Sequence, residues 1–247
     1  MSLTKVENKR NISVDIGNTR IKTGLFEHSK LIESQNFLNL AELAKYCLAT
    51  PHDKLGLISV GKSKNEILQI LGVFKPLLIT IDSSLPIKME YKTPETLGID
   101  RVVAAIGASS QHPNKNILVV DMGSCITYDL VDANNTYLGG IISPGLQMRM
   151  QAMATFTQNL PDIRNEWENH QGESLGKSTK ECLARGSYQA IIHEIDGFME
   201  EFRREYAQLT VILTGGDAFN FESKVKQPIF ADSFLVLKGI DKILSKE

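Results

Sequence analysis

Short apolar runs alternate with helical patterns over the first 111 residues. Runs rich in Val, Ile and Leu between polar turns are typical of strands, whereas apolar residues three and four apart are typical of helices. Strands are therefore predicted at 12–16, 20–26, 31–37, 54–61 and 76–81, and helices at 39–49, 63–74 and 97–111. Asn39 and Ser63 are predicted N-caps, and Glu66 completes a capping box with Ser63. The alternation indicates a layered α/β fold.

The pattern restarts after a polar segment at 111–116, which Pro113 interrupts. Residues 117–132 predict a buried strand, a turn and a second strand, and 136–145 predict a strand with a glycine-rich turn. Farther on we expect a helix in "LQMRMQAMATF" and a long helix at 179–207 that could break near Gly186. A buried strand that runs into a turn is expected at 209–218, and a closing helix in "FLVLKGIDKIL". These patterns predict two domains, residues 1–112 and 113–247.

The composition fits an ordinary soluble protein and excludes several other classes. Of the 247 residues, 42% are apolar and 23% are charged, and the net charge is −2. Such a balance gives no broad attraction to nucleic acid or to a membrane surface. Cys47, Cys125 and Cys182 lie far apart without a C-x-x-C motif, which argues against a disulfide framework or a zinc site. With no signal-peptide pattern and no membrane-length apolar run, we expect a cytoplasmic protein.

The two halves open with the same motif. The first begins I-S-V-D-I-G-N around Asp15, and the second begins L-V-V-D-M-G-S around Asp121. In both, an aspartate stands at the end of an apolar strand, and a glycine follows two residues later. Asp-x-Gly is common in hairpin turns, so chance is one explanation. The shared flanking strands favour instead a repeat of two halves with like topology.

Turns of this composition are suited to binding phosphate. Glycine lets backbone N–H groups approach an oxygen atom closely, and a neighbouring carboxylate can hold the metal ion that neutralises phosphate charge. The first turn offers Asp15 for Mg²⁺, together with Gly17, Asn18, Thr19 and Lys22 for ATP phosphates. Lys22 could equally be a solvated surface lysine. Gly215 and Gly216 in "LTGGDA" form a third candidate nucleotide element, although glycines after a strand often serve only the turn.

Asp100 is the candidate catalytic residue. It lies at a predicted helix start after a loop that contains proline and glycine, where an acid also interacts favourably with the helix dipole. A carboxylate there could accept a proton from a substrate hydroxyl during phosphoryl transfer.

The segment "GGIISPG" at 139–145 could form a wall of small residues beside a substrate. "GESLGKST" at 172–179 is rejected as a Walker motif, because its glycines enclose three residues instead of four and no apolar strand precedes it.

Taken in order, these motifs resemble type III pantothenate kinases, which belong to the superfamily of actin, hexokinase and Hsp70. The motifs are DIGNTRIKTG, Y-x-x-P-x-x-x-G-I-D-R, DMGSCIT, GGIISPG, STKECLARG and LTGGDA, and they span nearly the whole chain. The resemblance implies two ribonuclease-H-like domains with a nucleotide cleft between them, and a homodimer. It implies ATP-dependent phosphorylation of pantothenate, the first committed step towards coenzyme A, with Mg²⁺ and a monovalent cation, K⁺ or NH₄⁺.

The resemblance also assigns roles residue by residue. Asp100 matches the proton acceptor, Asp121 the monovalent-cation ligand and Ser124 a nucleotide contact. The pantothenate pocket matches Tyr91, Gly98, Ile99, Asp100, Arg101 and Thr179. Two departures stand out, because Ser124-Cys125 replaces the usual Thr-Ala and Ile99 replaces a common alanine. Serine keeps the hydroxyl, and neither change removes an ionisable group.

Three other functions remain open at this point. Another small-molecule hydroxyl kinase of the superfamily would show the same two turns, and a substrate panel would separate it from a pantothenate kinase. A non-catalytic regulatory relative would be favoured by loss of Asp15 or Asp100, but both are present. A filament-forming protein is suggested only by the actin-like topology, which does not determine function.

Overall fold

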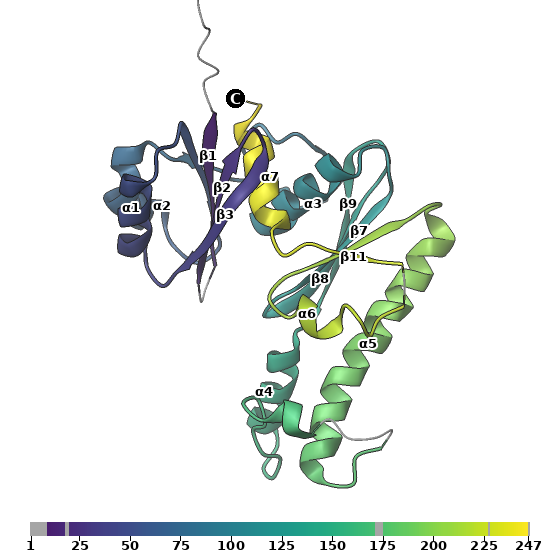
Figure 1. Ribbon diagram of the computed structural model, residues 1–247. Coiled ribbons are helices and arrows are strands. Elements are labelled where there is room, and N and C mark those ends of the chain that lie inside the picture. Colours follow the sequence, from purple (N-terminus) through teal and green to yellow (C-terminus); the bar gives the residue numbers. More distant parts are fainter. Residues whose placement is uncertain (1–8, 18–19, 171–174, 227, 247) are drawn as a thin grey trace, which may run out of the picture. The chain divides into compact units, whose positions relative to one another are not determined.

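Each D-x-G hairpin begins a sheet. The computed structural model describes the chain except for residues 1–8, 18–19, 171–174, 227 and 247 (Figure 1). The first sheet has the strand order β3-β2-β1-β4-β5. Its strands are β1 (Arg10–Ile16), β2 (Ile21–Glu27), β3 (Lys30–Phe37), β4 (Lys54–Ser59) and β5 (Leu77–Leu78). β2 pairs antiparallel with β1 and β3, whereas β4 runs parallel to β1 and β5.

The second sheet has the order β11-β10-β7-β8-β9-β6. Its strands are β6 (Lys88–Met89), β7 (Ile117–Met122), β8 (Cys125–Val131), β9 (Thr136–Pro144), β10 (Thr210–Thr214) and β11 (Phe230–Ala231). β8 pairs antiparallel with β7, and β10 lies parallel to both β7 and β11. Apart from the added edge strand β6, the two sheets share one strand order. This agreement confirms the predicted repeat of two halves with like topology.

Helices cover both faces of the first sheet. α1 (Leu40–Ala49) and α2 (Lys64–Leu71) lie on one side, and α3 (Ile99–Gln111) and α7 (Leu235–Leu244) lie on the other (Figure 1). Successive strand residues point to opposite faces. Accordingly Ile12, Val14 and Ile16 of β1 join the core with α1 and α2, while Asn11 donates a hydrogen bond of 2.8 Å to Asp241 of α7. Asp15 is in phase with Asn11, so it faces the side of α3 and α7.

The helices α3 and α7 pack at very short distance through two glycines. A Cβ atom on Gly107 of α3 would overlap the carbonyl oxygen of Leu235, and one on Gly239 of α7 would overlap the carbonyl oxygen of Val103. Only residues without a side chain allow the two backbones to approach this closely. The packing fixes α3, which carries Asp100 in its first turn.

The second sheet is covered by a long helix. α5 (Thr179–Glu205) packs with α4 (Leu146–Phe156), and α6 (Ala218–Phe221) is a single turn after β10. Their shared core includes Val120, Tyr128 and Ile191. The predicted break near Gly186 is wrong, since α5 is continuous. A glycine inside a helix costs about 1 kcal/mol, and burial of the neighbouring Leu183 and Ala184 offsets that cost.

The chain divides into two compact units that differ from the predicted domains. The first unit comprises residues 1–114, 134–138 and 234–247, and the second comprises 115–133 and 139–233. The predicted domains, 1–112 and 113–247, follow the sequence repeat and stay a prediction. The structural units differ because α7 packs on α3 and β1, and because β6 pairs with Thr136 and Tyr137 at the start of β9.

Most predicted elements are confirmed, with differences at their ends. The N-caps Asn39 and Ser63 accept hydrogen bonds from the backbone of Glu42 and Glu66, and the Ser63 capping box is complete. The strand predicted at 76–81 is reduced to β5. The strand predicted to run into a turn within 209–218 is confirmed, since β10 ends at Thr214 before the two glycines. Within the described part of the chain, no helix combines the length and apolar character that a membrane span requires.

Candidate active site

The first D-x-G turn joins β1 to β2. The backbone N–H of Gly17 donates to the carbonyl oxygen of Arg20 at 3.1 Å, which closes the turn. Asp15 stands directly opposite Lys22 in the antiparallel register. The hairpin therefore presents a carboxylate and an ammonium group side by side next to its turn. The predicted phosphate ligands Asn18 and Thr19 lie outside the described residues.

Asp15 has an unusual electrostatic environment. Burial raises the pKa of its carboxyl from 3.8 to about 6, the nearby Lys22 lowers it, and the negative charge of Asp100 raises it further. The effect of Asp100 means that the two carboxyls lie close enough to interact. The fold thus brings together, within the first unit, the predicted metal ligand and the predicted proton acceptor.

Asp100 is positioned by the start of α3. Gly98 is the N-cap, Ile99 is the first helical residue, and Asp100 lies in the first turn. The Oδ1 atom of Asp100 accepts a hydrogen bond of 3.0 Å from the backbone N–H of Arg101. A Cβ atom on Gly98 would lie 2.5 Å from the same oxygen, so the carboxylate folds back over Gly98. Placement at a helix N-terminus stabilises the charged form of Asp100.

The other predicted substrate residues of the first unit lie in two places. Arg101 directly follows Asp100 and is buried. Tyr91 follows β6, and its ring centroid lies 6.1 Å from that of Tyr137, at an interplanar angle of 59°. Their assignment to a pantothenate pocket, together with Gly98 and Ile99, stays a prediction.

The second D-x-G turn joins β7 to β8. Asp121 pairs with Thr127 in the antiparallel register, and the N–H of Gly123 donates to the carbonyl oxygen of Cys125 at 3.0 Å. Ser124 is exposed at the tip of the turn. Its carbonyl oxygen accepts a hydrogen bond of 3.1 Å from the N–H of Gly145. The turn is thus held by backbone contacts while the Ser124 side chain faces solvent.

The segment "LTGGDA" lies against this second turn. Thr214 pairs with Asp121 in the parallel register of β10 and β7. Gly215 has a φ angle of +94°, and a Cβ atom there would lie within 2.5 Å of Oδ1 of Asp121 and of the Met122 nitrogen. The N–H of Asp217 donates to the carbonyl oxygen of Met122 at 3.0 Å. Three sequence-predicted residues, Asp121, Ser124 and Gly215, therefore belong to one small region of the second unit.

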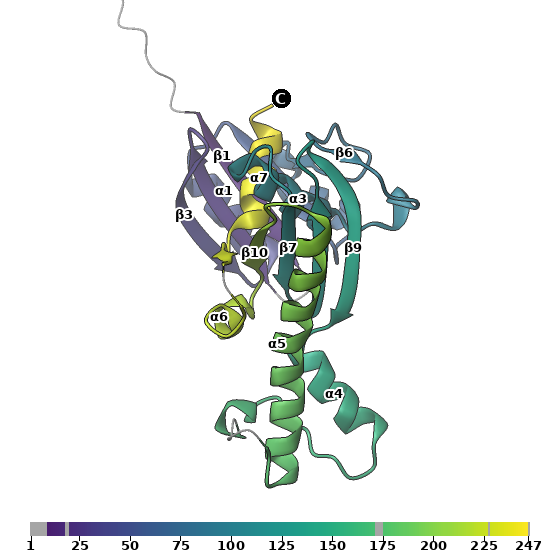
Figure 2. The same cartoon turned by 90° about the vertical axis from the view of Figure 1, so that its right-hand side faces the viewer.

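Thr179 lies elsewhere in the second unit. It is the exposed first residue of α5, after the N-cap Ser178. α5 extends away from the sheet, and its N-terminal end lies beside α4 (Figure 2). The structure does not bring Thr179 to the region of Asp121 and Gly215. Its role in a substrate pocket stays a prediction.

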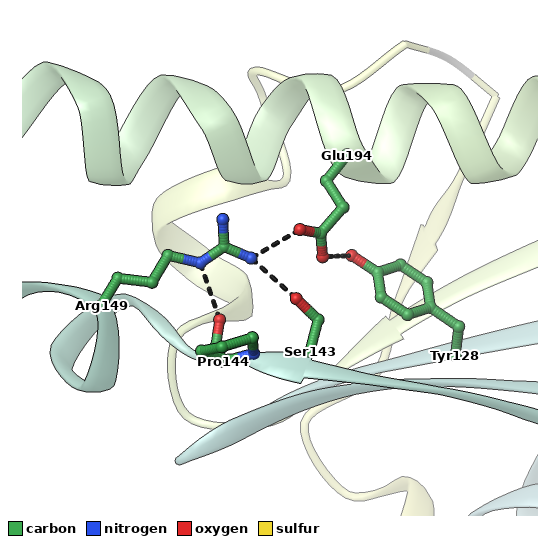
Figure 3. Close-up of polar contacts among 5 residues, drawn as sticks. All are labelled: Tyr128, Ser143, Pro144, Arg149 and Glu194. Carbon is green, nitrogen blue, oxygen red and sulfur yellow. Dashed lines mark hydrogen bonds and ion pairs between the residues drawn. The ribbon is translucent and has the colours of Figure 1, made fainter. Parts of the chain in front are cut away.

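A polar network in the second unit has no signal in the sequence motifs. Arg149 of α4 forms an ion pair with Glu194 of α5 at 2.6 Å and donates to Ser143 and to the carbonyl oxygen of Pro144 (Figure 3). Tyr128 of β8 donates to the other oxygen of Glu194 at 2.8 Å. The local pattern around Arg149 gives no indication of a partner. The partner Glu194 is far along the chain, so the pair is visible only in three dimensions.

Glu194 is charged despite its partial burial. Burial alone would raise the pKa of its carboxyl, but hydrogen bonds from Arg149, Tyr128 and Ser143 outweigh that effect and lower the pKa. Conversely, burial and the hydrogen bond to Glu194 raise the pKa of the Tyr128 hydroxyl. The network is therefore a charged pair with a neutral tyrosine donor.

The oxygen donors of these turns suit hard cations. Among the described residues no group of three or more His, Cys, Asp and Glu side chains forms a metal cluster. Mg²⁺ in phosphoryl-transfer sites is commonly held by one or two carboxylates together with substrate phosphates, so a full protein cage is not required. The partly buried Asp15, whose charge is disfavoured by burial and by Asp100, fits such a cation. Asp121 offers a carboxylate and adjoining backbone oxygens for a second cation.

Two solved structures share the fold of this protein. The ethanolamine utilization protein EutJ from Carboxydothermus hydrogenoformans aligns with a TM-score of 0.54 and 13% identity, over 95% of this chain and 90% of that one. A ROK hexokinase from Thermus thermophilus aligns with a TM-score of 0.51 and 14% identity, over 96% and 100% of the two chains. The chain thus has the fold of these two proteins, with an α/β sheet in each half.

The family follows from closer relatives. The family model described as type III pantothenate kinase matches residues 11–201. A type III pantothenate kinase from Bacteroides fragilis (strain YCH46) is 39% identical over 239 residues, which cover 95% of this chain and 97% of that protein. The chain belongs to the type III pantothenate kinase family.

Proposed function

We propose that this protein transfers the γ-phosphoryl group of ATP to the primary hydroxyl of pantothenate. The product is 4′-phosphopantothenate, and the reaction is the first step of coenzyme A biosynthesis. Family membership over nearly the whole chain supports this activity. The structural observation that carries the proposal is the proximity of Asp15 and Asp100, whose charges interact within the first unit.

Asp100 acts as the proton acceptor. Phosphoryl transfer requires a positioned nucleophile and neutralised phosphate charge, and a carboxylate that accepts the hydroxyl proton orients the attacking oxygen. The hydrogen bond from Arg101 N–H to Oδ1 fixes the carboxylate at the helix start. The second oxygen, Oδ2, is the atom we assign to the substrate hydroxyl.

The nucleotide is assigned to the two D-x-G turns and the glycine-rich segment. Lys22 and the backbone of Gly17 bind phosphate in the first turn, together with Asn18 and Thr19. Ser124, Gly215 and Gly216 contact the nucleotide from the second unit. Asp15 would hold Mg²⁺ and Asp121 would hold K⁺ or NH₄⁺. When bound, these ions neutralise the negative charge of the phosphates.

Pantothenate is assigned to the region around the start of α3. Tyr91, Gly98, Ile99 and Arg101 form its pocket in this proposal, and Arg101 supplies positive charge for an anionic substrate. Thr179, the first residue of α5, is assigned to the same pocket, and a homodimer is part of this proposal. The three free cysteines fit a cytoplasmic enzyme.

A coupled assay of ADP release tests the function. The purified protein is mixed with MgATP and pantothenate, with and without K⁺, and the product mass is measured. We expect ADP release that depends on pantothenate and increases with K⁺, and a product heavier by one phosphoryl group. A matched panel of sugars and polyols separates this activity from that of a related hydroxyl kinase. Equal turnover with a sugar, or no turnover with pantothenate, would contradict the proposal.

A further inference from the structure

The second D-x-G turn contacts the junction of β9 and α4, residues 143–145, through backbone atoms. Gly145 is buried, and its N–H donates to the carbonyl oxygen of Ser124 at 3.1 Å. A Cβ atom on Gly145 would lie 2.5 Å from the carbonyl oxygens of both Gly123 and Ser124. The turn and the β9–α4 junction are therefore in direct contact, and the position of Gly145 bears on that of Gly123 and Ser124.

Arg149 contacts this junction of β9 and α4 from within α4. Its Nε atom donates to the carbonyl oxygen of Pro144 at 2.8 Å, and its terminal nitrogen donates to Oγ of Ser143 at 2.8 Å (Figure 3). The guanidinium is planar and presents its donors at fixed angles. One side chain thus fixes the two residues that precede Gly145.

Glu194 fixes the guanidinium in turn. Its Oε2 accepts from the same terminal nitrogen of Arg149 at 2.6 Å, and its Oε1 accepts from the Tyr128 hydroxyl at 2.8 Å. Both members of the ion pair are mostly buried, with 19% and 22% of their side chains exposed. Tyr128 belongs to β8, the strand that begins directly after Ser124. The contacts form a closed circuit from Ser124 through Tyr128, Glu194 and Arg149 to Gly145.

A mostly buried ion pair such as Arg149 and Glu194 adds little net free energy of folding. Removing two charges from water costs free energy that their attraction only partly returns, and apolar replacements of buried pairs are often neutral or stabilising. The advantage of an arginine and a carboxylate is directional, because charge-assisted hydrogen bonds fix angles as well as distances. Accordingly the network is suited to fixing the orientation of a turn.

We propose that Arg149 and Glu194 are positioning residues that orient the second phosphate turn for ATP. They act through Pro144 and Gly145, and they do not touch the substrate themselves. The inference rests on the proposed role of the Ser124 turn in binding nucleotide. It predicts a selective effect on ATP, since pantothenate is assigned to residues of the first unit and to Thr179, which begins α5 and makes none of the contacts of Arg149 and Glu194 described above.

The test compares Arg149→Lys and Glu194→Ala with matched controls. Lysine keeps the charge of Arg149 but cannot make the bonds to Pro144, Ser143 and Glu194 together. We expect the KM for ATP to rise about ten- to a hundredfold, as expected for lost charged hydrogen bonds, while the KM for pantothenate changes less than about twofold. Glu194→Gln keeps the shape and one acceptor oxygen for Arg149, while its amide N–H can donate to the Tyr128 hydroxyl, and it should recover most of the ATP affinity lost in Glu194→Ala.

Two ion pairs of the second unit provide the controls. Arg164→Lys alters the exposed pair of Arg164 with Asp162. Glu200→Ala removes the partner of Lys226 from the same helix that carries Glu194. Neither pair takes part in the described contacts of residues 143–145, so both variants should keep the ATP affinity of the parent.

Circular dichroism and thermal melting establish that each variant is folded. ATP binding is also titrated by ligand-observed NMR without pantothenate, which separates this inference from the proposed function. If the parent binds ATP but does not phosphorylate pantothenate, the proposed function fails and the inference is still tested by the binding constants. Unchanged ATP affinity in folded Arg149→Lys and Glu194→Ala, equal loss for both substrates, or no ATP binding by the parent would overturn it.

Discussion

Gly215 lies directly against the carboxylate of Asp121. A Cβ atom at this position would come within 2.5 Å of Oδ1 of Asp121 and of the backbone nitrogen of Met122. The residue also has a φ angle of +94°, which side chains of L-amino acids rarely tolerate. Glycine is thus required at this position for two reasons. The backbone conformation excludes a side chain, and the segment "LTGGDA" approaches the D-x-G turn of Asp121 closely.

Gly215→Ala should destabilise the second unit and displace Asp121. Backbone strain of this kind costs about 1–3 kcal/mol, and relief of the overlap moves the carboxylate that we assign to the monovalent cation. We expect a lower melting temperature and a weaker response of turnover to K⁺. Gly216→Ala is the control for stability, because a Cβ atom there meets nothing within 4 Å. Equal melting temperatures of the two variants would contradict the steric argument.

Asp100→Asn should reduce kcat by about a hundred- to ten-thousandfold, the range expected for loss of a general base. The fold should persist, since the amide oxygen can still accept the hydrogen bond from Arg101 N–H. The same substitution removes the negative charge that raises the pKa of Asp15. An NMR titration of the Asp15 carboxyl should therefore give a lower pKa in Asp100→Asn than in the parent. Full turnover would exclude the proton-acceptor role, and an unchanged Asp15 pKa would exclude the proximity of the two groups.

The pKa of Asp15 predicts a pH-dependent effect on stability. Because its pKa rises from 3.8 to about 6 on folding, the folded state binds the proton more tightly, and Asp15 lowers the stability as pH rises from about 4 to about 6. Asp15→Asn should therefore raise the melting temperature at pH 8. The corresponding gain in the free energy of unfolding is at most about 3 kcal/mol. The gain should shrink toward pH 4 even though activity is lost.

Glu95→Gln is the control for Asp15→Asn, because it removes an exposed carboxylate of the same unit. Its melting temperature should follow that of the parent across the pH range. A stabilisation by Asp15→Asn that is the same at pH 4.5 and pH 8 would show that the titration of Asp15 is not its cause.

The sequence predicted those features that depend on neighbouring residues. The caps at Asn39 and Ser63 follow from short-range hydrogen bonds, and the two hairpins follow from apolar runs around D-x-G turns. The repeated motif also predicted two sheets of one topology. Each of these signals is contained in a few consecutive residues, so periodicity and turn chemistry were sufficient.

Features that depend on distant residues were missed. The two-residue strands β6 and β11 carry too little pattern to be recognised, and the assignment of α7 to the first unit depends on packing with α3. The pair of Arg149 and Glu194 joins two helices far apart in sequence. Arg149 also stands in a helix rich in methionine, where periodicity gives no indication of a partner. Tertiary contacts, not local propensity, determine all of these features.

The packing of α3 on α7 gives the last prediction, which concerns the support of Asp100. Gly107→Ala would place a Cβ atom against the carbonyl oxygen of Leu235 and 3.1 Å from the nitrogen of Gly239. Both obstacles are backbone atoms, so the helices must separate. Overpacking of this kind costs about 1–3 kcal/mol, and we expect a lower melting temperature together with reduced kcat, because α3 positions Asp100.

The control is Gly197→Ala in α5, an exposed helical glycine around which a Cβ atom meets nothing within 4 Å. Alanine there should stabilise the protein by up to about 1 kcal/mol, since glycine is the poorer helix former. Hydrogen exchange locates the effects, because Gly107→Ala should accelerate exchange in α3 and α7 while Gly197→Ala slows it in α5. If Gly107→Ala is as stable as Gly197→Ala, the close approach of α3 and α7 does not exist in solution, and the rigid support inferred for Asp100 fails with it.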